Sequence, residues 1–242
     1  MRVVRSLAVV KAMTKPPHTW PLAGAHDLTS KRSIAKTRDE SEARILDHVR
    51  QGASVTLFSL LYSTHATGAF AHVPALWDER VVPLCAVVPL CAVDAPVVSF
   101  WWDGSLPAGA VPTLADVTEM VRAIVEGLHL DAHEVVVAMV LLESLVVRHG
   151  DVVQPFSVRP VLLAACIVTL KLTRDVNTTT TQCVESMAER FTALTPLLGA
   201  RIERQLLEYL DWRVPNDPAV YERVLALLRE ATPPNMLPPS MM

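Results

Sequence analysis

The segment from Val158 to Lys171 constrains the fold of this chain more than any other. Its central ten residues, VLLAACIVTL, carry no charge, and nine of them are apolar. An α-helix with this sequence is hydrophobic on every side, so it is stable only where other elements cover it. Ser157 is expected to cap the helix, and Pro160 is tolerated because the first turn has no intrahelical N–H bond to lose. We therefore expect a buried helix at the centre of a bundle.

Segments on both sides of this run carry helical signals of their own. Each begins at a threonine or aspartate that can accept a hydrogen bond from a first-turn N–H, and apolar residues follow at helical spacing. The predicted helices cover residues 113–128, 131–148, 195–210 and 217–230, and a further helix begins at one of the threonines of the polar loop 177–181 and ends near Phe191. No segment after Pro112 combines strand alternation with hairpin turns. The pattern predicts an all-α domain, in which Gly199 marks a close contact between two helices.

The distribution of proline divides the chain near Pro112. Nine of the 18 prolines lie in the first 112 residues, whereas residues 113–194 contain only two. Because proline interrupts helix interiors, regular helices are expected to begin after this point. We predict a disordered or targeting tail (1–39), a region with a short helix (40–51, ended by Gly52) and an irregular proline-rich insertion (40–112 in all), the helical domain (113–230) and a disordered tail (231–242).

Composition and charge argue against several classes of protein. The mean hydropathy is +0.31. The longest apolar run, Val81–Val93, nevertheless contains two prolines and is shorter than the roughly 18 residues that a membrane helix needs, so no membrane role is expected. The net charge of -3 offers no basic surface for nucleic acid. We expect a nuclear or cytoplasmic protein, with organelle targeting by the basic residues 1–15 left open.

Residues with catalytic or metal-binding chemistry are scattered along the chain. His129 and His133 are four residues apart, but Asp131 between them is a helix cap, so His129 lies outside the helix. The four cysteines form no C-x-x-C pair, and Cys166 falls within the apolar run, where a buried, inert thiol is expected. Nucleophile motifs and phosphate-binding glycine loops are missing. The sequence therefore predicts no catalytic residue, metal, cofactor or small-molecule ligand.

Two charged residues stand at unusual positions. Lys171 directly follows the apolar run, so it is expected at the C-terminal end of the buried helix, where a cation suits the helix dipole. Glu203 lies beside Ile202, near the apolar stripe of the 195–210 helix. A charge that is partly sheltered on a mostly apolar helix usually has a partner. The alternative is that the two are unrelated, solvated charges.

The order of these motifs resembles the cyclin box. LLAACIVTLKLTRD, residues 162–175, is similar to the third helix of that family, and RIERQLLEYLDWRVP, residues 201–215, is similar to the fifth. Arg122 stands where cyclins have an arginine of the first helix, and Glu143 stands where they have an aspartate of the second. Within the family, the chain resembles the P/U-type cyclins most. The resemblance implies a five-helix box around a buried central helix over residues 113–230, with flanking helices.

The resemblance also implies roles for particular residues. Lys171 and Glu203 would bind a cyclin-dependent protein kinase, and Arg122 would form a structural ion pair with Glu143 inside the domain. The protein would then be a regulatory subunit that activates the kinase, and not an enzyme itself. Two alternatives stay open. One is a cyclin-fold scaffold or transcription-factor-like protein-binding module without a kinase partner, and the other is an all-helical enzyme or organelle protein.

Overall fold

Helices are the only regular secondary structure in the part of the chain that its computed structural model describes, so the predicted all-α class is confirmed there. The described residues are 28–67, 73–79, 81–82, 84, 112–150, 152–174, 178–215 and 217–231. The helices are α2 (Leu28–Thr67), α3 (Leu114–Gly127), α4 (Ala132–His149), α5 (Val158–Thr173), α6 (Thr180–Met187), α7 (Pro196–Tyr209) and α8 (Pro218–Ala231). The predictions for residues 1–27, most of the proline-rich insertion and the 232–242 tail lie outside the described residues.

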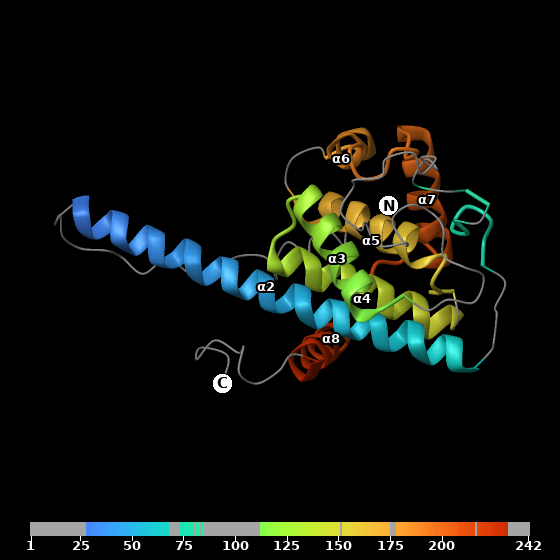
Figure 1. Ribbon diagram of the computed structural model, residues 1–242, viewed down its shortest axis with the longest axis horizontal. Coiled ribbons are helices and arrows are strands. Elements are labelled where there is room, and N and C mark those ends of the chain that lie inside the picture. The colour runs from blue at the N-terminus through green and yellow to red at the C-terminus, as the bar shows by residue number, and fades with distance from the viewer. Residues whose placement is uncertain are drawn as a thin grey trace, which may run out of the picture.

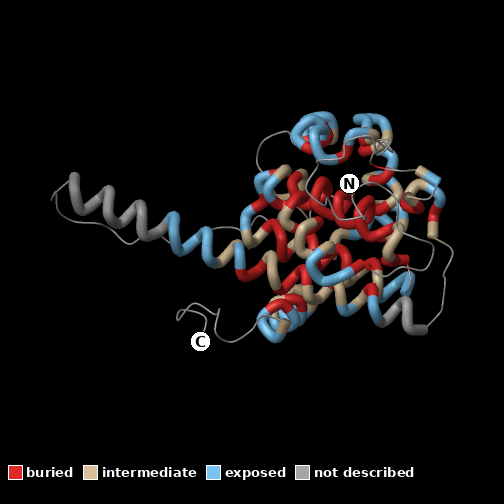
Figure 2. Tube along the Cα trace, viewed as in Figure 1, coloured by how far each residue is buried: buried red, intermediate tan, exposed pale blue. Residues whose placement is uncertain are grey.

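Helix α5 is the buried helix that the sequence predicts. Every residue from Val158 to Leu170 is buried, and both α4 and α7 pack against it. Figure 2 shows the buried part of the chain concentrated in the bundle around this helix. Pro160 lies in the first turn, where the absence of its N–H breaks no helical hydrogen bond. Burial on all sides leaves only the last turn of α5 to carry polar side chains toward solvent.

Four helices begin at the kind of capping residue that was predicted. A threonine or aspartate side chain accepts a first-turn backbone N–H at the start of α3, α4, α6 and α7, namely Thr113, Asp131, Thr179 and Thr195. Ser157 is the N-cap residue of α5, as predicted, but its side chain makes no capping hydrogen bond. Its hydroxyl donates to the carbonyl of Val152 (2.6 Å) and accepts from the backbone N–H of Gln154 (2.8 Å). Because these partners in the preceding turn occupy the hydroxyl, it does not cap α5.

Helix α2 is far longer than the predicted helix at 40–51. Residues 28–39, which the sequence assigned to a disordered tail, are helical, and Gly52 does not end the helix. A stripe of buried residues recurs every four positions through its second half: Val49, Ala53, Leu57 and Leu61. This stripe faces the bundle, where α3, α4 and α8 pack against α2. The N-terminal part of α2 projects beyond the bundle (Figure 1).

Gly52 serves a close helix crossing. A Cβ atom built on Gly52 would lie 2.6 Å from the backbone oxygen of Leu228 in α8. A backbone oxygen cannot move away unless the whole helix moves, so a larger residue would push α8 off α2. The glycine that looked like a helix stop is therefore explained by packing between α2 and α8.

A non-helical segment after α2 lies along the bundle. We call it the strap; its described residues are 73–79, 81, 82 and 84, all within the predicted irregular insertion. Trp77 is fully buried, and its ring packs on that of Tyr209 at the end of α7, with 4.9 Å between ring centroids. The carbonyl of Leu84 accepts a hydrogen bond from the backbone N–H of Ala193, just before α7 (3.0 Å). The strap thus runs beside α7 (Figure 1).

A buried ion pair fastens the strap to the start of α5. The side chain of Arg159 is 4% exposed and that of Glu79 is 9% exposed. Arg159 Nε donates to Glu79 Oε1 at 2.9 Å, and a second guanidinium nitrogen, Nη2, contacts the other carboxylate oxygen. The backbone N–H of Glu79 also donates to the carbonyl of Phe156 (3.0 Å). Two elements 80 residues apart in sequence are joined in this way.

Candidate functional site

Lys171 and Glu203 lie side by side at the junction of α5 and α7. Lys171 is in the last turn of α5, with 32% of its side chain exposed, and Glu203 follows the fully buried Ile202 on α7, with 12% exposed. Lys171 Nζ is 2.6 Å from Glu203 Oε1 and 2.7 Å from Oε2. The expectation that these sheltered charges have a partner is confirmed, because each one is the partner of the other.

Thr180, the first residue of α6, is the third member of this group. Its Oγ1 accepts a hydrogen bond from Lys171 Nζ (2.7 Å) and donates one to Glu203 Oε2 (2.6 Å). We call the three side chains the Lys–Thr–Glu cluster. In the sequence, the threonine run around residue 180 indicates only a polar loop and a helix cap. The only sequence signal for Thr180 as a member of the cluster is its place in the chain, between the helix of Lys171 and the helix of Glu203.

Gly199 sets the position of Thr180 relative to Glu203. A Cβ atom built on Gly199 would lie 2.6 Å from Val184 Cγ2 and 3.2 Å from Thr180 Cγ2. The predicted close helix contact at Gly199 is therefore confirmed, and α6 is the helix in contact. Because Thr180 and Val184 are one turn apart on α6, the α6 side chains pack directly on the α7 backbone. This contact brings the Thr180 hydroxyl to Glu203, which lies one turn further along α7.

The cluster adjoins a buried thiol that is a poor nucleophile. Cys183, on the turn of α6 that follows Thr180, is free and buried, as is Cys166 in α5. Burial raises the pKa of the Cys183 thiol, while the nearby Lys171 ammonium opposes this shift and the Glu203 carboxylate adds to it. Burial raises the pKa of the Cys166 thiol as well. Thiols whose pKa lies above the ordinary value are protonated near neutral pH, so Cys183 and Cys166 are not suited to thiolate chemistry. The reactive feature of the Lys–Thr–Glu cluster is therefore its charge.

The ion pair predicted between Arg122 and Glu143 is wrong. Arg122 is on the solvent side of α3, where its guanidinium pairs with Glu119 and Glu126, one turn away in either direction (2.5 and 3.0 Å). Glu143 on α4 accepts instead from Arg223 Nε of α8 at 2.5 Å. The reason is the packing of the helices: α2 lies against both α3 and α4, and α8 lies against α4. Glu143 therefore faces α8 and not α3.

A different ion pair joins α4 to α5. Glu134 is buried, and its carboxylate accepts from Arg174 Nε (2.8 Å) and Nη2 (3.0 Å) and from the hydroxyl of Thr173 (3.2 Å). It also accepts from the backbone N–H of Asp131 in the capping box (2.9 Å). Burial by itself would raise the pKa of Glu134. The hydrogen bonds from Arg174 and Asp131 and the charge of Arg174 outweigh burial, so the pKa lies below its ordinary value of 4.5.

This shift predicts a pH-dependent stability. A carboxyl whose pKa is lower in the folded protein stabilises the fold above its ordinary pKa and loses that effect as the pH falls through the folded-state value. Glu134→Gln is therefore expected to lower the free energy of unfolding by about 1.5–3 kcal/mol at pH 7. The deficit should shrink below about pH 4.5. Urea unfolding between pH 7 and pH 3 measures it, with the exposed Glu230→Gln as control. A deficit of equal size at every pH would contradict the charge-based explanation.

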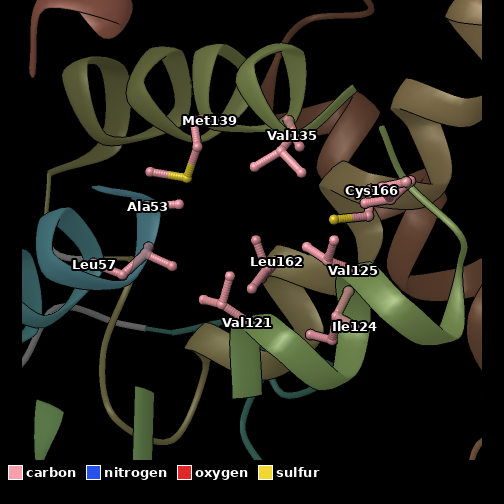
Figure 3. A pocket seen from close by; sticks show the side chains of 11 residues that line it. Ala53, Leu57, Val121, Ile124, Val125, Val135, Met139, Leu162 and Cys166 are labelled. Carbon is pink, nitrogen blue, oxygen red and sulfur yellow. The ribbon is translucent and has the colours of Figure 1, made fainter. Parts of the chain in front are cut away.

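A small apolar cavity lies among α2, α3, α4 and α5. Its volume is about 10 Å³. Figure 3 shows side chains such as Leu57, Val121, Met139 and Leu162 around it. This is about the space of one water molecule, and the lining offers no polar partner for one. The cavity is therefore a packing gap in the core and has no room for an organic ligand.

The described residues give no indication of a metal centre or of a membrane span. No group of three or more His, Cys, Asp or Glu side chains among them is arranged to hold a metal ion. Within the same residues, none of the helices has the length and apolar character needed to cross a membrane. Comparison of the chain with protein-family models, with curated proteins and with solved structures finds no match. The site must therefore be interpreted from its own geometry.

Proposed function

We propose that this chain is a cyclin-like regulatory subunit that binds and activates a cyclin-dependent protein kinase through Lys171 and Glu203. The observation that supports the proposal is the pairing of these two residues. The resemblance to cyclins selects them as kinase contacts although they lie 32 residues apart, and their charged atoms are 2.6 and 2.7 Å from each other. Both stay partly open to solvent, so a partner can reach them.

The arrangement of the helices is compatible with this proposal. In it, α3 to α7 form the cyclin box, α5 is the central helix, and α2 and α8 are the flanking helices. The central position of α5 matters for the mechanism because its 13 buried residues fix the backbone that leads to Lys171. A charged group on a rigid support loses little conformational entropy on binding, which favours affinity and a defined register.

The mechanism in this proposal is allosteric, and catalysis is carried out by the kinase. The apolar surface of the chain supplies affinity for the regulatory helix of the kinase, and the Lys–Glu pair fixes the register of the contact. Binding energy of this kind shifts the kinase toward the conformation in which its own lysine–glutamate ion pair is formed. A subunit that binds the active conformation more tightly by about 1–3 kcal/mol shifts the equilibrium 5- to 150-fold.

The double variant Lys171→Ala/Glu203→Ala tests the proposal. We expect affinity purification followed by mass spectrometry to recover a cyclin-dependent kinase with the unmodified protein and none with the variant. The helical circular dichroism spectrum should not change, because a partly exposed ion pair contributes only about 0.2–1 kcal/mol to stability. Recovery of the kinase at the level of the unmodified protein would overturn the assignment of the two residues.

A matched control removes the same charges from another helix. Glu222 and Arg229 are exposed on α8, which packs against α2 and α4. The variant Glu222→Ala/Arg229→Ala therefore keeps the net charge of the test variant but leaves the Lys–Thr–Glu cluster intact. It should recover as much kinase as the unmodified protein. If the unmodified protein itself recovers no kinase, the scaffold alternative gains support.

A further inference from the structure

The N-terminal part of α2 is a helix that leaves the bundle. It projects beyond the other helices (Figure 1), and residues 39–44 within it are all exposed. A short helix in water gains little stability unless one of its faces packs against another element. The described part of the bundle supplies no such cover for residues 39–44. This part of α2 is therefore a helix face in search of a partner.

One face of this segment continues the stripe that packs into the bundle. Steps of three and four residues lead back along α2 from the buried Val49 to its first residue. Positions with this spacing share one face of an α-helix, and the alternation of three and four is the heptad pattern of coiled coils. We call these six positions the outer stripe, and they are Leu28, Lys31, Ala35, Arg38, Glu42 and Ile45.

The order of charges along the outer stripe distinguishes two ways of pairing it with a second copy. In a parallel pair each residue lies opposite itself, so Lys31, Arg38 and Glu42 would each meet the same charge and repel it. In an antiparallel pair centred between positions 36 and 37, Lys31 lies opposite Glu42 of the second copy. The outer stripe is therefore complementary to itself only in the antiparallel orientation.

The other positions fit the same antiparallel register. Leu28 lies opposite Ile45 of the second copy, which joins two apolar side chains at each end of the pair. Ile45 is half-buried where α2 leaves the bundle, so it keeps an open side for this contact. Arg32 and Asp39 flank the outer stripe on the same side, and residues that flank the seam of a coiled coil pair across it. The register thus brings opposite charges together beside the seam as well.

We propose that the outer stripe of α2 is a dimer interface that binds the outer stripe of a second copy of this chain in antiparallel orientation. A two-fold axis makes every contact occur twice, so one sequence supplies both halves of the charge pattern. The apolar part of the interface is small, which favours a reversible dimer that weakens as salt screens its charges. This surface is separate from the Lys–Thr–Glu cluster, and the inference does not depend on the proposed function.

Sedimentation equilibrium and chemical cross-linking of the full chain test the proposal. We expect a monomer–dimer equilibrium whose dissociation constant rises several-fold between about 0.1 M and about 1 M salt. A zero-length carbodiimide link should join Lys31 to Glu42 in the dimer. Within one chain these residues are about 16 Å apart along the helix axis, so the link forms only between copies. A protein that stays monomeric, or a dimer without this link, would overturn the inference.

Charge reversal tests the same pair of residues. Lys31→Glu and Glu42→Lys each place like charges in contact, and each should raise the dissociation constant of the dimer at least about 10-fold. An equimolar mixture of the two variants should dimerise again, because two glutamates of one chain then face two lysines of the other. Lys31→Glu puts an acid in the first turn of α2, where the helix dipole favours it, so the helix itself is not weakened.

Matched controls make the same changes away from the outer stripe. Lys36→Glu and Glu40→Lys alter α2 at positions off the stripe and should leave the dimer intact. Circular dichroism should show equal helix content in all four variants. If Lys31→Glu and Glu42→Lys dimerise like the unmodified protein, another surface forms the dimer and the inference is overturned. A mixture of these two variants that stays monomeric would equally overturn the pairing of Lys31 with Glu42.

Discussion

Arg159→Ala is expected to lower the free energy of unfolding by about 3–5 kcal/mol, because it leaves the Glu79 carboxylate buried without its partner. Both side chains of this pair are less than one tenth exposed. The alanine removes the guanidinium that contacts both carboxylate oxygens, and the strap would lose its attachment to the start of α5. Urea unfolding followed by circular dichroism measures the loss.

A double substitution tests whether the stranded Glu79 carboxylate causes the loss of stability. Glu79→Leu/Arg159→Met replaces the pair with apolar side chains of similar size, and such replacements are often neutral or stabilising. We therefore expect the double variant to recover most of the stability that Arg159→Ala loses. Equal losses in the two variants would show that the stranded carboxylate is not the cause of the instability.

The same pair predicts the direction of a pH effect. Burial raises the pKa of Glu79 above its ordinary value of 4.5, although the charge and hydrogen bonds of Arg159 act to lower it. Without Arg159, the pKa of Glu79 should rise further. A carboxyl with a raised pKa in the folded state binds its proton more tightly there, so the fold gains stability as the pH falls. The deficit of Arg159→Ala should accordingly be smaller at pH 5 than at pH 7.

The features that the sequence predicts correctly depend on short-range interactions. Thr113, Asp131 and Thr195 cap their helices through contacts only three residues away, and the buried run of α5 is visible as an unbroken apolar stretch. Gly199 could be interpreted because a glycine inside a helix needs a packing reason. Gly52 also has a packing reason, but the sequence does not show it, because its contact Leu228 in α8 lies more than 170 residues further along the chain.

Ion pairs between residues far apart in the chain cannot be predicted from short-range sequence patterns. Many carboxylates could accept from Arg159 or Arg174, and a single sequence does not say which helix faces which. The pairing of Arg122 with Glu143 was inferred from the resemblance to cyclins, and it failed because Glu143 faces α8. Lys171 and Glu203 differ from these cases. Their positions at the edge of apolar runs indicated sheltered charges, which need a partner nearby.

Exchanging the two charges should abolish partner binding and preserve the fold. In Lys171→Glu/Glu203→Lys the cluster keeps one ammonium and one carboxylate at the junction of α5 and α7, so an internal ion pair can form again. Thr180 fits either order because a hydroxyl both donates and accepts. The exchange puts a carboxylate near the C-terminal end of α5, which costs about 0.3–1 kcal/mol through the helix dipole. Each single charge reversal should be less stable than the double exchange, because it places like charges in contact.

Binding to the proposed kinase responds differently, because the groups of the kinase that meet Lys171 and Glu203 do not change with them. After the exchange, the kinase meets a carboxylate in place of the ammonium and an ammonium in place of the carboxylate. Favourable contacts with both charges become repulsive, and the affinity for a cyclin-dependent kinase should fall more than about 100-fold. Thermal unfolding and kinase titration of the two single variants and the double variant measure both quantities. If the double exchange restored kinase binding together with stability, Lys171 and Glu203 would serve only to hold α5 and α7 together, and the kinase contact would have to lie elsewhere on the bundle.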